Sequence, residues 1–405
     1  MRAALAILVL AIACHGDADS ARQPLGIPYE LVFDLDLGRV VDDWAVEVRL
    51  ELVTELGASA KSVTISPTGA LEVTPSDPTR VDEVRGAIER ALSGEITWRP
   101  CERDPSSRAV CFAMSDAMTR TAKKAALAQA VKTVNERLVA LKEDHATAVA
   151  RGQQIVVKLL ARGAAGVEAL QSVIGKRGRV ELKVVDDGSD YMKRLYERVA
   201  GTRRSGADAD PTATAAGIRA EADSWSSEGG SNHIDYYLIA DDQRKIEHYS
   251  ARLADLDPTL KLPDDRELGF ERIEPQQSGD RVKWRSYYLE RATSLTGAAI
   301  DDAHAATDPA ANDWPIVKVE LTRKGARDFD DLTTRIAGKK LATIVDGSIT
   351  SAPVVLGPIH GGRLWIAMGG SDRAAAQRAA EGLAVVLRTG ALPSPLVLAT
   401  MQPVP

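Results

Sequence analysis

Aromatic residues and cysteines are scarce in this 405-residue chain, and each scarcity excludes a class of function. Phe, Trp and Tyr make up 4% of the residues, which is too few for a surface that stacks on nucleic-acid bases. The formal net charge is −6 and no long Lys/Arg run occurs, so the basic face of a nucleic-acid binder is also missing. We therefore predict no nucleic-acid partner.

The sequence also lacks the common catalytic signatures. It has no HExxH, GxSxG, Walker or GxGxxG motif. The six histidines are scattered without a ligand pair at helical spacing, and three cysteines are too few for a CxxC zinc site. Doubled acids such as Asp42-Asp43 fall at predicted helix starts or turns, where acids are favoured without catalysis. We predict no enzyme, metal or cofactor, because a hydrolase would need an acid/base cluster that the sequence does not show.

A single basic residue, Arg2, precedes a short apolar run, Ala3 to Ala13. This run is too short for a spanning helix, which needs about 20 apolar residues, and fits the core of a signal peptide. The small-x-small pattern at 11–13 stands before Cys14 and resembles a bacterial lipobox, although Ala11 replaces the preferred Leu. The resemblance implies a lipid on Cys14, after a signal peptide and tether at 1–27. Cleavage at the same bond without lipidation is the alternative.

Export changes how the other two cysteines are interpreted. Cys101 and Cys111 flank ERDPSSRAV, a Pro/Ser turn between two short β-like runs. In an oxidising compartment such a pair can form a disulfide across a hairpin, provided that the geometry allows it. The alternative is two reduced structural cysteines.

Apolar periodicity predicts an α+β fold in the first half of the chain. In the segment 28–93 we expect a strand, a helix that stops at Gly57, two short strands around Thr68-Gly69 and a second helix. From 116 to 190 the order is helix, strand, helix, strand. The long helix of this second segment has one apolar stripe, formed by Leu127, Val131, Val134, Leu138 and Leu141.

The second half of the chain begins with a segment of different composition. The segment 201–232 is rich in Ala, Gly, Ser and Asp, and is predicted to be a long loop or mobile insertion with a short helix near Ile218. Strand patterns return after it. Asp346-Gly347 indicates a tight hairpin, and a last helix is expected from an N-cap at Ser371 to a stop at Gly390.

Three motifs in the last third carry a resemblance. SLTGAAIDDAHA, GKKLATIVDGSITSAPVVLGPIHGGRLWIAMGG and AEGLAVVLRTGALPSPL occur in this order and closely resemble the head of the periplasmic domain of SecD, a membrane subunit that aids Sec protein export. Upstream, VNERLVAL, GQQIVVKLL and LQSVIGKRGRVELKVV resemble its base. The resemblance implies ferredoxin-like βαβ-type lobes in a base at 28–275, with lobes at about 28–115 and 116–190, and a separate α+β head with an antiparallel sheet at 276–405.

The chain departs from this family at both ends. In SecD the Leu/Pro-rich strand leads into membrane helices that carry the ionisable residues of proton coupling, whereas here the sequence ends within about ten residues of Pro395. We therefore expect the extracytoplasmic part alone, held by its lipid on the periplasmic face of a bacterial membrane. It would aid Sec-dependent export without proton conduction, by binding translocating polypeptide or docking on translocon components. An envelope lipoprotein that reuses the head fold as a structural or partner-binding module is the alternative.

The predicted binding surface lies around the Gly/Pro-rich bend of the head. Apolar side chains near this bend could take up an extended client chain, which would pair with an exposed strand edge. Equally, these residues could simply pack under the Ala-rich helix 371–389. The candidates are Leu356, Ile359, Trp365 and Met368.

Overall fold

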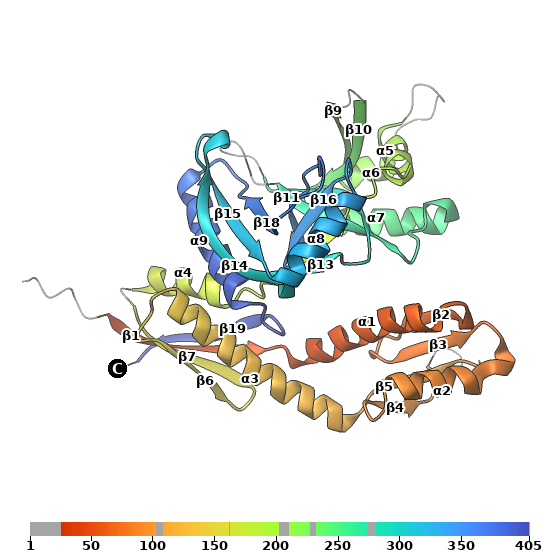
Figure 1. The fold of residues 1–405 in the computed structure, drawn as a ribbon, viewed down its shortest axis with the longest axis horizontal. Helices are drawn as coiled ribbons and strands as arrows, with labels where there is room; N and C mark the ends of the chain where they lie inside the picture. Colours follow the sequence, from red (N-terminus) through yellow and green to blue (C-terminus); the bar gives the residue numbers. More distant parts are fainter. Residues whose placement is uncertain are drawn as a thin grey trace, which may run out of the picture.

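A computed structural model describes residues 26–102, 108–161, 163–201, 210–226, 232–273, 275 and 281–404 of the protein. These residues form an α+β fold with four β-sheets, as predicted from the sequence. A base of two lobes lies below a head, and the base is elongated along its two longest helices (Figure 1). Among the described residues, no helix combines the length and the hydropathy that a membrane crossing requires.

The main lobe of the base is a four-stranded antiparallel sheet covered by helices on one face. Its strand order is β19-β1-β7-β6, which is the split βαβ order of a ferredoxin-like fold. Leu31 and Phe33 of β1 point to the covered face, where they pack with Val134 and Leu138 of α3. The elements are β1 (Ile27–Leu35), α3 (Asp116–Ala140), β6 (Thr147–Arg151), β7 (Gln154–Ala161), α4 (Ala164–Ile174) and β19 (Leu396–Pro403).

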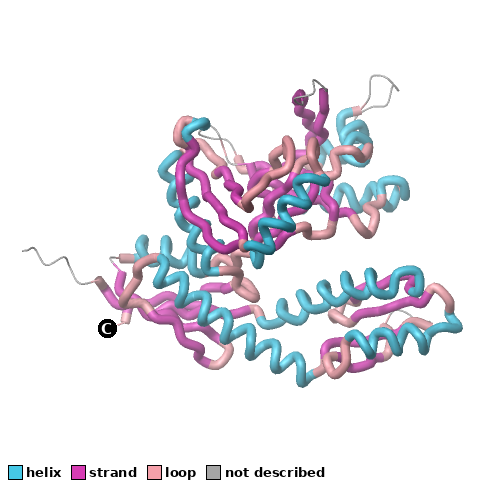
Figure 2. Tube along the Cα trace, in the orientation of Figure 1, coloured by secondary structure: helices cyan, strands magenta, loops and turns pink. Residues whose placement is uncertain are grey.

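Two long helices, α1 (Leu37–Leu56) and α3, lead from the main lobe to a small lobe and back (Figure 2). Asp36 caps α1 by accepting from the N–H groups of Gly38 and Arg39, and Ser115 caps α3 through Met118. The small lobe has its own sheet, of order β2-β3-β5-β4, and its own core. It contains β2 (Ala60–Ile65), β3 (Leu71–Pro75), α2 (Val81–Ala91), β4 (Ile96–Arg99) and β5 (Val110–Met114), with 3₁₀ turns at Gly57–Ser59 and Pro78–Arg80.

The head contains an eight-stranded sheet of order β13-β8-β16-β17-β11-β12-β10-β9. Helices cover one face of its β10–β12 half, and Tyr191 stacks there on Tyr288. Its elements are β8 (Val180–Val184), α5 (Tyr191–Ala200), α6 (Pro211–Ala215), β9 (Arg219–Ser226), β10 (Asn232–Ala240), α7 (Gln243–Leu256), β11 (Arg266–Ile273), β12 (Lys283–Glu290), β13 (Leu295–Thr296), β16 (Leu341–Val345) and β17 (Ser348–Ser351), with a 3₁₀ turn at Pro258–Leu260.

A second, three-stranded sheet of the head has the order β14-β15-β18 and packs one face against α9. It is built from β14 (Ile300–Asp308), β15 (Trp314–Leu321) and β18 (Arg363–Ala367), together with α8 (Arg323–Arg335), α9 (Arg373–Thr389) and 3₁₀ turns at Gly297–Ala299 and Pro309–Ala311. The whole head lies in the sequence between α4 and β19, so the chain leaves the base after α4 and returns to it after α9. The head is therefore an insertion into the main lobe.

Several sequence predictions are confirmed locally. Asp346 and Gly347 both have positive φ, 52° and 84°, in the predicted tight turn between β16 and β17. The last helix stops at Gly390, whose φ of 81° suits glycine. Its N-cap is Asp372 and not Ser371, because the Asp372 carboxylate accepts from the N–H groups of Ala374 and Ala375.

Other predictions need correction. The segment 201–232 is not one long loop, because its described part forms α6 and the strand β9, which pairs along β10. Contiguous lobes at 28–115 and 116–190 also differ from the observed sheets. The predicted boundary between a base at 28–275 and a head at 276–405 is crossed by the eight-stranded sheet, in which β11 pairs with β12. The strand β1 pairs with β7 and β19 in the main lobe, and β8 pairs with β16 in the head, since strands far apart in the sequence complete each sheet.

Candidate functional site

The outer strand of the three-stranded head sheet, β18, presents an edge and an exposed face. It pairs with β15 on one side, and within the described part of the chain no strand pairs with its other side. Leu364 and Ile366 point toward the core, whereas Arg363 and Trp365 point away from it. This alternation is what a half-buried strand requires, and it places an indole on the open side of an edge strand.

Trp365 belongs to a row of side chains that crosses the exposed face of this sheet. It lies opposite Lys318 of β15, which in turn lies opposite His304 of β14, and all three residues are exposed. Two residues before Trp365, on the same face of β18, Arg363 forms an ion pair with Glu320, with 3.4 Å between Nε and Oε1. The face therefore combines one large apolar group with charged neighbours of both signs.

The four residues that the sequence suggests for polypeptide binding differ in how far they are exposed to solvent. Trp365 and Leu356 are exposed, at 65% and 68% of their surface. Ile359 is half-buried, and its N–H donates a hydrogen bond to Thr333 Oγ1 at 2.9 Å. Met368 is only 7% exposed and fills the core between the three-stranded sheet and α9. Packing thus removes Met368 from the predicted contact set, and leaves Trp365 and Leu356 accessible.

A second notable arrangement joins the base to the head at the two chain crossings. Arg137 of α3 has no exposed surface, and its guanidinium donates to main-chain carbonyls of both crossings. The contacts to Ile174 O and Gly390 O measure 2.9 and 3.0 Å. Burial lowers the pKa of Arg137 to about 10, so the side chain is protonated at neutral pH. Its other acceptors are Val173 O, Lys176 O, Arg177 O and Thr389 Oγ1.

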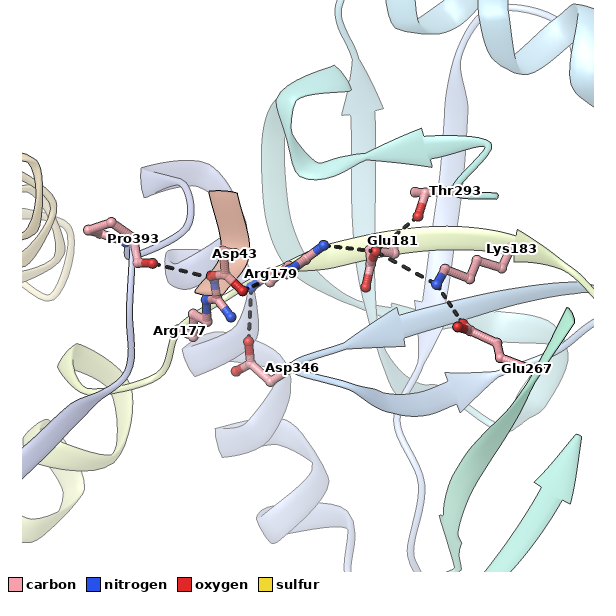
Figure 3. A network of polar contacts seen from close by, with 9 residues as sticks. All are labelled: Asp43, Arg177, Arg179, Glu181, Lys183, Glu267, Thr293, Asp346 and Pro393. Carbon is pink, nitrogen blue, oxygen red and sulfur yellow. Dashed lines mark hydrogen bonds and ion pairs between the residues drawn. The ribbon is translucent and has the colours of Figure 1, made fainter. Parts of the chain in front are cut away.

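From this junction a polar network extends along β8 into the head (Figure 3). Arg177 donates to Asp43 of α1 and to Pro393 O, so α1 is tied to both crossings. The main-chain N–H of Arg179 donates to Asp346 at 2.9 Å. Further along, Glu181 accepts from Arg179 and from Thr293, and Lys183 reaches Glu267 at 2.6 Å. The network joins groups from the base, β8, β11 and the β16–β17 turn.

Arg137 was not among the residues predicted from the sequence, although its position in the helix pattern could have indicated it. Arg137 lies three residues after Val134 and four before Leu141, and so falls on the apolar stripe of its helix. A charged residue on a buried stripe indicates a satisfied buried cation, because an unpaired one would be too costly. The acceptors themselves could not be predicted, since they come from linkers far along the chain.

The structure describes two of the three cysteines, Cys101 and Cys111. Cys101 and Cys111 have their sulfur atoms 2.10 Å apart and their Cα atoms 5.2 Å apart, as a disulfide. It joins Cys111 of the strand β5 to Cys101, two residues after the end of β4, at one edge of the small-lobe sheet. Cys14, the predicted lipidation site, lies outside the described residues.

The described ranges contain no group of three or more His, Cys, Asp or Glu side chains placed to hold a metal ion. His233 stacks on Trp225, with 4.3 Å between ring centroids. Nearby, Lys340 forms an ion pair with Asp235, which is the most buried pair among the described residues. Lys340 is 7% exposed and Asp235 is 8% exposed. The two charges neutralise each other, which is how buried charges are ordinarily accommodated.

Comparison with known proteins bears on both parts of the molecule. Residues 272–394 match the family described as SecDF, P1 head subdomain. The protein translocase subunit SecD of Anaeromyxobacter dehalogenans is 25% identical over 405 aligned residues, which cover 95% of this chain and 63% of that protein. SecD of Desulfurispirillum indicum is 35% identical over 135 residues, which cover 33% of this chain and 25% of that protein. The chain thus spans less than two thirds of either relative, and the predicted resemblance to SecD is confirmed.

Solved structures of SecDF are also similar to this chain. SecDF in its super-membrane-facing form is 22% identical with a TM-score of 0.41, and the match covers 69% of this chain and 28% of that one. A structure of SecDF described as a membrane component that enhances protein export is 22% identical with a TM-score of 0.40, and covers 69% of this chain and 93% of that one.

Proposed function

We propose that this protein acts outside the cytoplasm as a non-enzymatic accessory of Sec-dependent protein export, and that it contacts translocating polypeptide through the open edge of β18. The observation that carries the proposal is Trp365, 65% exposed on an edge strand of the region that matches the SecDF P1 head subdomain. The similarity to SecD along most of the chain supports the more general part of this proposal, which is a role in protein translocation.

The chemistry of the edge suits a client without a fixed sequence. An extended chain that adds to a strand edge gains main-chain hydrogen bonds, which every sequence can form. Trp365 adds a large apolar surface, and Lys318 beside it offers a cation to acidic clients. Such contacts are weak singly, as a transient guiding step requires.

Photocrosslinking in intact cells tests this role. A photoreactive phenylalanine analogue at position 365 should capture secreted polypeptides or Sec components during export. The same analogue at Val139, which is 74% exposed on α3, is the matched control and should capture neither. If folded protein yields no such adduct at position 365, the proposal fails.

The same experiment separates the alternative function. An envelope lipoprotein that reuses the head fold for one fixed partner would give a single dominant adduct that does not depend on ongoing export. Blocking translocation would then leave the adduct unchanged. A client or translocon contact would instead lose its adduct when translocation stops.

We further propose that a lipid on Cys14 holds the protein at a bacterial membrane, facing the periplasm. The support is the short apolar run and the small-x-small pattern before Cys14. Changing Cys14→Ser should move the protein from the membrane fraction to the soluble periplasmic fraction, because a lipid anchor cannot form on serine. Retention of the variant in the membrane fraction would contradict the anchor.

A further inference from the structure

Two helices, one from the base and one from the head, end at the same buried cation. α4 of the base ends at Ile174 and α9 of the head ends at Thr389. Nη1 of Arg137 donates to Ile174 O at 2.9 Å, and Nη2 donates to Gly390 O, just past α9, at 3.0 Å. The last carbonyls of a helix have no partners within it and carry the negative end of the helix dipole. A cation at this point therefore satisfies both helix ends at once.

The acceptors around the Arg137 guanidinium are uncharged oxygen atoms. Five are main-chain carbonyls and one is the hydroxyl of Thr389. They belong to the end of α4, to a first crossing at 175–179, to the end of α9 and to a second crossing at 390–395. Each of the three guanidinium nitrogens donates, so the charge can lie in a site without exposed surface.

The two crossings are also fixed to each other. The N–H of Leu392, in the second crossing, donates to Arg177 O, in the first crossing, at 2.7 Å. Leu392 is 1% exposed, and Gly178 lies against the buried side chain of Val386 in the last turn of α9. A rotation of the head about the crossings would break these contacts, because closely packed groups do not deform freely.

The second long helix of the base adds a contact of its own. Asp43 of α1 forms an ion pair with Arg177, and Arg177 also donates to Pro393 O in the second crossing at 3.3 Å. Both α1 and α3 run from the small lobe to this junction (Figure 1). Each of the two helices that carry the small lobe is therefore attached to both crossings.

We propose that the Arg137 guanidinium fixes the head in a single orientation on the base, so that the small lobe, the main lobe and the head move as one body. Any other orientation of the head would separate the end of α9 from the end of α4. The guanidinium would then lose acceptors in a site that water does not reach. Arg137 is thus a positioning residue. The proposal concerns how the head is held, so it does not rest on the contact proposed for Trp365.

Distances between spin labels test this orientation in the full chain. Double electron–electron resonance measures the distribution of distances between two labels on introduced cysteines. One label replaces Lys124 on α3, and the other replaces Thr307 or Asp331 in the head, all of which are exposed. Cys14→Ser removes the remaining thiol, and the disulfide stays intact. We expect one narrow peak for each pair between base and head.

Two substitutions separate a positioning role from a purely structural one. Arg137→Lys keeps the charge but replaces the planar set of donors with one compact ammonium group, and Arg137→Gln also removes the charge. In both variants the distributions between base and head should become at least about twofold broader, since more orientations are populated. The pair Thr307 and Asp331, both within the head, is the matched control and should keep its width. Lys132→Ala, on the exposed side of α3, should leave every distribution unchanged.

Three results overturn the proposal. They are a broad or two-peaked distribution between base and head in the protein without an Arg137 substitution, unchanged widths in both variants, and equal broadening of the pair within the head. If neither variant folds, hydrogen exchange in the unsubstituted protein decides. The Leu392 amide should exchange as slowly as the amide of Val157 in the centre of the base sheet. Exchange of Leu392 that is at least about a hundredfold faster would show that the crossings open while the base stays folded.

Discussion

The α-carbon of Gly178 lies against the side chain of Val386, so closely that a Cβ on residue 178 would come within 2.3 Å of Val386 Cγ1. The same Cβ would lie 3.2 Å from Nη2 of Arg137. Gly178 also has a φ of 75°, in the left-handed region that glycine adopts without cost. The first crossing between base and head therefore passes through a space that admits only glycine.

A comparison of two glycine substitutions measures this constraint. Gly347→Ala, in the tight turn, has a similar φ of 84° but open space around its Cβ, so it should cost about 1–2 kcal/mol in the free energy of unfolding. Gly178→Ala adds overpacking, which contributes about 1–3 kcal/mol more. Urea unfolding followed by circular dichroism gives both values. Equal costs would show that the contact with Val386 relaxes freely.

Removal of the Arg137 guanidinium should destabilise the protein more than any surface change on α3. Arg137→Ala leaves several buried carbonyls without their donor, at about 1–3 kcal/mol each, so we expect a loss of at least about 3 kcal/mol. Lys132→Ala changes an exposed residue of the same helix, whose ion pair with Glu136 is 3.7 Å long, and should stay within about 0.5 kcal/mol. Similar stabilities of the two variants would contradict the role of Arg137 as the link between the crossings.

Local features of the fold followed from the sequence because they depend on neighbouring residues. The stripe from Leu127 to Leu141 predicted α3, and Asp346-Gly347 predicted the turn of its hairpin, since both reflect short-range geometry. Which strands share a sheet could not be predicted from the sequence. Leu31 lies opposite Met401 in the base, almost a whole chain length away, and no periodicity encodes such a pairing.

The same distinction applies to the candidate sites. The sequence offered Trp365 and Met368 together, as apolar residues near one bend, and could not say which of them packs under the last helix. Met368 is buried there because α9, a separate element, covers it, whereas Trp365 lies on the opposite face of β18. The exposure of Val46, Leu50 and Val53 on α1 could not be predicted for the opposite reason. A helix with apolar residues on two sides looks like a helix that is buried on both, and only the packed structure shows that Leu50 remains exposed.

Loss of the disulfide should destabilise the small lobe. In the chain-entropy account, a bond that closes a loop of ten residues restricts the unfolded chain and contributes about 2–3 kcal/mol. Cys101→Ser with Cys111→Ser should therefore lower the thermal midpoint, and so should reduction of the wild-type protein. The double variant is the control for the reductant, since its midpoint should not respond to reduction. A wild-type midpoint that is insensitive to reduction would contradict the contribution.

Alkaline pH should unfold the protein through its buried tyrosines. Burial, and next the neighbouring Tyr288, raise the pKa of Tyr191 to about 12 from an ordinary value near 10. Burial also raises the pKa of Tyr237, Tyr249 and Tyr287. Between pH 10 and 12 the unfolded chain loses the Tyr191 proton while the folded chain keeps it. The unfolded state then binds fewer protons, so stability falls as pH rises.

A phenylalanine variant isolates the contribution of one hydroxyl. Tyr191 is 2% exposed, so the full pKa shift applies to it. The difference in pKa between the folded and unfolded states should lower the free energy of unfolding by roughly 2–3 kcal/mol between pH 10 and 12. Tyr191→Phe keeps the ring that stacks on Tyr288, 4.6 Å away, but has no proton to lose. Urea unfolding at pH 8, 10 and 11 should show a shallower decline for the variant, and absorbance at 295 nm should show one fewer late-titrating tyrosine. Parallel declines in the two proteins would show that Tyr191 ionises at its ordinary pKa in the folded state.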